Sequence, residues 1–83
     1  MSSVHGLIME QEWFPSFILI CKNLLRRMNE NEEDYRPVKS ICQCESYSQV
    51  LSIVEAYNND DFEDMIHRQQ VLAKKAVARE KRQ

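Results

Sequence analysis

The stretch WFPSFILIC, from Trp13 to Cys21, is apolar apart from Pro15 and Ser16. From Phe14 onward, within this stretch and after it, apolar residues follow the i, i+3, i+4, i+7 spacing of a helix. They are Phe14, Phe17, Ile18, Cys21, Leu24, Leu25 and Met28. At 100° per residue they form one stripe about 120° wide. The pattern predicts an amphipathic helix over residues 14–28, with Pro15 in the first turn, where its missing N–H costs nothing.

The same stretch is too short to cross a membrane. Its apolar region extends at most from Trp13 to Leu25 and is interrupted by Lys22 and Asn23, whereas a spanning helix needs about 20 apolar residues. We therefore expect the stripe to form part of a protein core, with no membrane as a partner.

Two short apolar faces follow the polar loop NENEED, residues 29–34. The first consists of Val38, Ile41 and Cys42, and the second of Tyr47, Val50, Leu51, Val54 and Tyr57. On one continuous helix the two faces would lie about 140° out of phase. A break near Cys44–Glu45 removes this conflict. Ser46 and Gln49 have the spacing of a capping box for a new helix after that break.

The last predicted helix, over about residues 60–81, is the longest. Its stripe consists of Phe62, Met65, Ile66, Gln69, Leu72, Ala73, Ala76 and Val77, and Asp60 with Glu63 repeats the capping pattern. At 1.5 Å per residue it would be about 33 Å long, against about 22 Å for residues 14–28. We therefore expect its last two turns to project beyond the other helices.

These patterns, in a chain with one glycine and two prolines, predict an all-α fold. Its architecture is a small antiparallel bundle of three main helices, with a broken second segment and a long, projecting C-terminal helix. Eighty-three residues form one domain at most. We divide them into a partly ordered N-terminal segment, residues 1–12, and a single helical domain, residues 13–83.

Three large apolar residues do not fit the first stripe. Trp13 and Ile20 lie on its flank, and Leu19 lies on the opposite side of the helix. Apolar side chains on two sides of a helix indicate a second packing surface. Either the N-terminal residues 7–9 cover this surface or a second chain does, and the pattern does not separate the two.

A chain this small has little stability to spare, because burial is only about 60–65% of the unfolded surface. We therefore hypothesise a small non-enzymatic helical subunit or adaptor of an intracellular protein complex. Its partner-binding surface would consist of Trp13, Phe14, Leu19 and Ile20. Another protein is the expected partner, and a homodimer that uses the same surface is the alternative.

Charge is unevenly distributed along the chain. The total is −2, but residues 1–64 hold five basic and twelve acidic side chains, whereas residues 65–83 hold six basic and one acidic. The basic surface of the last helix would comprise Lys74, Lys75, Arg79, Lys81 and Arg82. These bases complement the helix dipole. They also suggest a nucleic-acid-binding or chromatin-associated module, although without neighbouring aromatics they offer only weak, salt-sensitive phosphate contacts.

Cofactors and catalysis have few candidate residues. Cys42 and Cys44 could in principle complete a Cys3His zinc site with Cys21 and His67. On a helix the two thiols would point about 200° apart, so they could share an ion only in an extended loop, and we predict no metal site. The only glycine is Gly6, which excludes a phosphate-binding loop, and we predict neither a cofactor nor an enzyme.

Three cysteines are too few for a disulfide scaffold, and the first residues lack a secretory pattern. We therefore expect an intracellular protein with reduced thiols. The basic end of the chain favours the nucleus over the cytoplasm.

Overall fold

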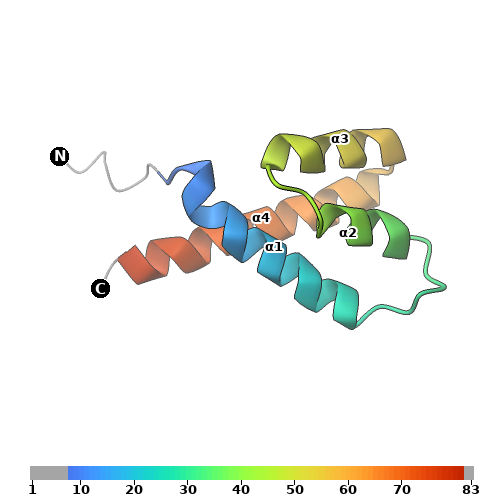
Figure 1. Ribbon diagram of the computed structural model, residues 1–83, viewed down its shortest axis with the longest axis horizontal. Coiled ribbons are helices and arrows are strands. Elements are labelled where there is room, and N and C mark those ends of the chain that lie inside the picture. Colours follow the sequence, from blue (N-terminus) through green and yellow to red (C-terminus); the bar gives the residue numbers. More distant parts are fainter. Residues whose placement is uncertain (1–7, 82–83) are drawn as a thin grey trace.

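A computed structural model describes residues 8–81, and this part of the chain forms four helices and no strand. They are α1 (Glu10–Arg26), α2 (Tyr35–Ile41), α3 (Tyr47–Tyr57) and α4 (Asp60–Lys81) (Figure 1). The predicted all-α bundle with a long C-terminal helix is confirmed. The broken second segment corresponds to the separate helices α2 and α3.

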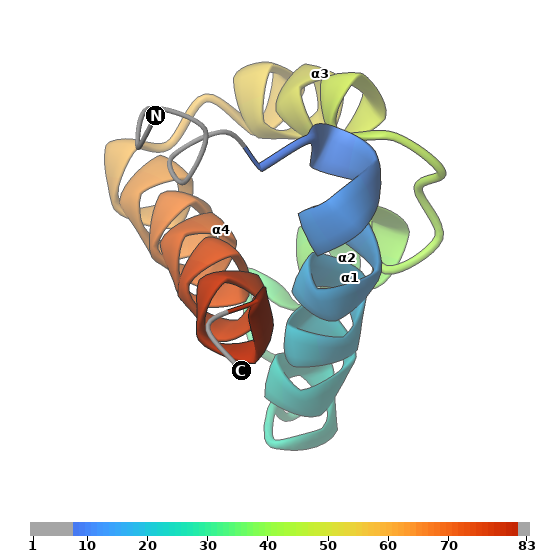
Figure 2. The same cartoon turned by 90° about the vertical axis from the view of Figure 1, so that its left-hand side faces the viewer.

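The arrangement is built around α1 and α4, which cross each other obliquely while running in broadly opposite directions (Figures 1 and 2). They are the most closely packed pair of helices, while α2 packs against both α1 and α3. The apolar stripes predicted for the first and last helices therefore face each other, as expected for an antiparallel bundle.

All four helices contribute to one core. Phe17, Cys21 and Phe62 are fully enclosed there, and four other members of the first stripe, Ile18, Leu24, Leu25 and Met28, pack against its edge. The buried residues are Trp13, Phe14, Phe17, Cys21, Val38, Ile41, Val50, Val54, Phe62, Ile66, Ala73 and Val77. One predicted core residue of the last helix is misplaced: Leu72 is 51% exposed.

The predicted break between α2 and α3 is confirmed, together with its cap. The Ser46 hydroxyl accepts a hydrogen bond from the Gln49 N–H at 3.4 Å. The Gln49 side chain reaches back to the N–H of Glu45 at 2.7 Å, one residue before the cap itself. The first contact satisfies an amide group that the first turn of α3 would otherwise leave unpaired. The second satisfies the amide of the residue before the cap.

Two predicted helix starts need correction. Because α1 begins at Glu10 rather than near Phe14, Pro15 lies in its second turn and not in its first. The predicted boundary between residues 12 and 13 therefore falls inside α1, while residues 1–7 of the N-terminal segment lie outside the described residues. At α4 the capping residue is Asn59 instead of Asp60, since the Phe62 N–H donates to the Asn59 side chain at 3.0 Å.

The end of α4 extends past α2 and α3, as its length predicted (Figure 1). It is nevertheless packed, because Val77 is buried and Lys81 forms an ion pair with Glu12 in the first turn of α1. The last turns of α4 are thus held alongside the start of α1.

Candidate partner-binding surfaces

Trp13 and Phe14 belong to the core rather than to a surface that is open to a partner. Trp13 is only 4% exposed. The Tyr47 ring of α3 meets it edge-on with the centroids 5.1 Å apart, and the Lys74 ammonium of α4 lies 5.5 Å from its centroid. This corrects the expectation that Trp13 is an exposed anchor. Tyr47 and Lys74, which are distant from Trp13 in the sequence, contact its ring.

Leu19 remains on the outer face of α1. Its side chain is 57% exposed, and Pro15 and Lys22, one turn away on either side, are exposed as well. Ile20, by contrast, is partly buried and packs against the core. Of the four residues predicted to bind a partner, Leu19 is therefore the one whose apolar surface is open.

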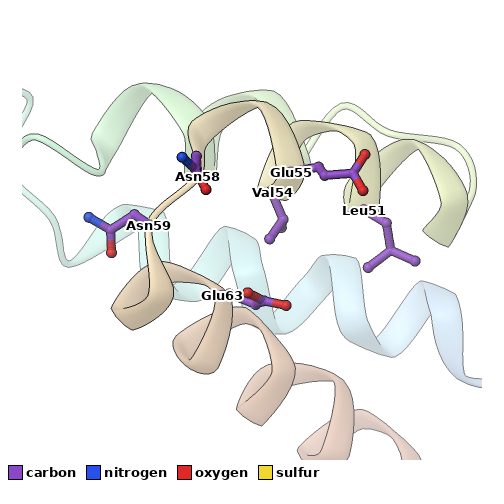
Figure 3. A pocket seen from close by; sticks show the side chains of 6 residues that line it. All are labelled: Leu51, Val54, Glu55, Asn58, Asn59 and Glu63. Carbon is purple, nitrogen blue, oxygen red and sulfur yellow. The ribbon is translucent and has the colours of Figure 1, made fainter.

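A second surface, which we did not predict from the sequence, lies between α3 and α4. Two hollows of about 230 Å³ and about 140 Å³ share Leu51, Val54 and Glu63 as lining residues. Leu51 and Val54 point from α3 toward α4, where Glu63 lies opposite them (Figure 3). We call the two hollows together the α3–α4 groove. Its lining residues are Tyr47, Leu51, Val54, Glu55, Asn58, Asn59, Glu63, Asp64, Ile66 and His67.

The groove is open because α3 is attached at both ends to other parts of the chain. At its start, the Tyr47 N–H donates to the Glu10 carboxylate of α1 at 3.1 Å. At its end, the Tyr57 ring meets Phe62 of α4 edge-on, with centroids 4.8 Å apart. Between these points α3 packs against α2, and α3 with α4 is not among the closely packed helix pairs. Leu51 is left 50% exposed.

The rim of the groove is acidic. Glu55, Glu63 and Asp64 line it, and no lysine or arginine among the described residues does so. Val54 and Ile66, which are both almost fully buried, lie at its base, and the half-exposed Leu51 lies at its edge. An apolar floor with carboxylates at the rim favours a ligand that is apolar on one side and positively charged beside it.

The predicted basic surface is divided by the fold. Lys74 contacts Trp13, and Lys81 pairs with Glu12. The Lys81 ammonium and the Met9 N–H hold the pKa of the Glu12 carboxyl below its usual value. Lys75 and Arg79 are exposed on α4, and Arg82 lies outside the described residues. Two of the predicted bases, although exposed, are thus each in contact with a residue of α1.

The cysteines are free thiols. Burial, together with the nearby Cys42 and Cys44, raises the pKa of the Cys21 thiol to about 12. Burial also raises the pKa values of Cys42 and Cys44, and the Cys44 thiol donates to the Ser40 carbonyl at 3.6 Å. A raised pKa lowers the thiolate fraction, which makes all three poor nucleophiles at neutral pH.

Within residues 8–81, no three histidine, cysteine or acidic side chains come together as a possible metal site. In the same part of the chain, no helix combines the length and apolar character that crossing a membrane requires. Comparison with protein-family models, curated proteins and solved structures gave no match to this chain.

Proposed function

We propose that this chain is a small, non-enzymatic helical subunit or adaptor that binds another protein through the outer face of α1. The observation that supports the proposal is the exposure of Leu19, which lies in the middle of a helix whose opposite side is fully used by the core. A half-exposed leucine still offers about 1 kcal/mol of burial free energy to a partner.

The charges around Leu19 favour a partner with an acidic rim. Lys22 and Arg26 follow Leu19 by three and seven residues, which places them on the same face of α1, and both are exposed. Apolar anchors that are surrounded by charge of one sign are typical of surfaces that select a complementary partner.

The alternative, a nucleic-acid-binding or chromatin-associated module, has less support. Lys74 and Lys81 are two of the bases that it requires, and both contact α1. Lys75 and Arg79 alone would provide few phosphate contacts, and such binding weakens steeply with salt.

The test compares Leu19→Asp with Leu72→Asp. Leu72 is a matched control because it is 51% exposed, close to the 57% of Leu19, but lies on α4. Each purified chain is used as bait in a cell extract, and the captured proteins are identified by mass spectrometry. We expect one partner to be retained by the native chain and by Leu72→Asp and lost by Leu19→Asp, with the helical circular dichroism of all three unchanged.

Two results would contradict the proposal. If Leu19→Asp unfolds the isolated chain, Leu19 supports the monomer instead of an interface. If both variants capture the same proteins as the native chain, α1 is not the binding surface. Light scattering across a concentration range adds a further distinction, because a native dimer that Leu19→Asp converts to a monomer would assign the surface to self-association.

A further inference from the structure

We propose that the α3–α4 groove binds an amphipathic helix of another protein that carries lysine or arginine beside its apolar residues. This second surface is independent of Leu19, because no residue of α1 lines the groove. The chain would then hold two different partners on two different faces.

The shape of the groove suits a helix better than a small molecule. Its hollows, about 230 Å³ and about 140 Å³, are each smaller than the roughly 300–1,000 Å³ of a typical small-molecule pocket. They follow one another along α3, where Tyr47, Leu51 and Val54 succeed each other at helical spacing. A row of small apolar hollows receives the i, i+3 or i+4, i+7 anchors of a bound helix.

The depth of the groove supports apolar insertion. Val54 and Ile66 lie at the base and are already buried, and the edge contact of Tyr57 with Phe62 ties α3 to α4 beside the turn (4.8 Å between ring centroids). Leu51, half exposed at the lip, would lose its remaining contact with water once a side chain lay beside it. Such a partly enclosed leucine contributes strongly only when a partner completes its burial.

The charge of the groove determines which class of helix fits. With Glu55, Glu63 and Asp64 at the rim and no lysine or arginine lining it, phosphates and acidic peptides are repelled. Cationic side chains that flank an apolar stripe would meet these carboxylates at the edge of the interface. There, complementary charges mainly increase the rate and specificity of association.

The experiment uses two synthetic peptides. One is an amphipathic helix with leucines at helical spacing and lysines beside them, and the other has glutamate in place of each lysine. Fluorescence anisotropy measures the binding of each peptide to the full chain, to Leu51→Lys and to Leu72→Lys. The two leucines are equally exposed, at 50% and 51%, and both variants change the net charge by the same amount, so general electrostatic attraction affects them equally.

We expect the lysine peptide to bind the native chain and Leu72→Lys alike, and to bind Leu51→Lys at least about tenfold more weakly. Glu63→Lys should show a similar loss, which keeps the test valid if Leu51→Lys fails to fold. The glutamate peptide should not bind.

Three outcomes would overturn the proposal. Equal binding by Leu51→Lys, Glu63→Lys and Leu72→Lys would show that the attraction is not located in the groove. A native dimer that Leu51→Lys converts to a monomer would assign the groove to a second copy of this chain. Binding that occurs only after residues 1–7 are removed would assign the groove to the chain's own N-terminus. None of these results depends on Leu19, so the proposals can fail separately.

Discussion

Helix α4 meets its two neighbours in different ways. Against α1 it forms the most closely packed helix pair of the described residues, with the Lys81–Glu12 ion pair near its end. Against α3 it is joined at the Asn58–Asn59 turn and then separates, leaving the half-exposed Leu51 over a groove. One helix therefore takes part in a closely packed interface with α1 and in a loosely packed one with α3.

The difference follows from where the aromatic residues lie. Most of the aromatic side chains lie along the α1–α4 pair or next to it, where Trp13 and Phe17 are both in edge contact with Tyr47. Little remains to fill the space between α3 and α4. In a small domain, apolar surface that the chain's own side chains do not cover is available to a partner.

The largest difference in the free energy of unfolding is expected between Phe17→Ala and Leu51→Ala. Phe17 is fully buried, so its truncation should cost about 3–5 kcal/mol of the free energy of unfolding. Because total stability of small domains is about 5 kcal/mol or less, we expect this variant to be largely unfolded. Leu51→Ala should lower the free energy of unfolding by only about 1 kcal/mol, because half of its side chain is exposed.

Urea denaturation followed by circular dichroism measures both variants of this pair. Comparable losses would mean that Leu51 is a core residue and that the groove closes in solution, which would remove the distinction between the two sides of α4.

A smaller effect is expected at the turn that joins α3 to α4. Asn58 has a left-handed conformation with φ 52°, and the Asn59 side chain then caps α4 by accepting from the Phe62 N–H. Asn59→Ala should lower the free energy of unfolding by about 1 kcal/mol, the typical loss for a helix N-cap. Asn59→Asp should retain the cap and most of the stability.

Thermal unfolding of Asn59→Ala and Asp60→Ala also tests which of the two residues caps α4. Asp60→Ala should cost less than Asn59→Ala, because Asp60 contributes only its charge near the helix N-terminus. The reverse order would restore Asp60 as the capping residue.

Local patterns were sufficient for the features that depend on neighbouring residues. The phase change between Cys42 and Tyr47 predicted two helices, and the Ser46–Gln49 spacing predicted the cap, because both concern groups within one or two turns. The core face of α1 was likewise evident from Phe14, Phe17 and Cys21, whose spacing is set by helix geometry alone.

Contacts between distant segments could not be predicted in this way. Periodicity placed Trp13 on the flank of a stripe, but its burial depends on how Tyr47 and Lys74 are placed in space. Leu72 fitted the stripe of α4 and yet is 51% exposed, because its burial depends on how the other helices are placed around α4 and not on its spacing alone. The α3–α4 groove was missed for the same reason, because its existence depends on the angle between two helices and on no single residue.

The smallest effect is expected at Tyr57, the last residue of α3, and it appears only at alkaline pH. Its hydroxyl donates to the Asp34 carboxylate at 2.7 Å. That hydrogen bond, together with burial and the negative charge of Asp34, raises the pKa of Tyr57 from 10.0 to about 12. A pKa that is higher in the folded state than in the unfolded chain means that folding is favoured while the phenol keeps its proton.

The contribution of this contact is therefore fully present below pH 10 and is lost as the pH rises through about 12. A spectrophotometric titration of phenolate absorbance should show one tyrosine that ionises near pH 12 in the native chain and is missing in Tyr57→Phe. Asp34→Asn keeps an acceptor but removes the charge, so the transition should move back toward the ordinary value of 10.0. Burial also raises the pKa of Tyr47, so the two titrations are compared by difference. Identical alkaline transitions in the native chain and in Tyr57→Phe would show that the pKa of Tyr57 is not raised by Asp34.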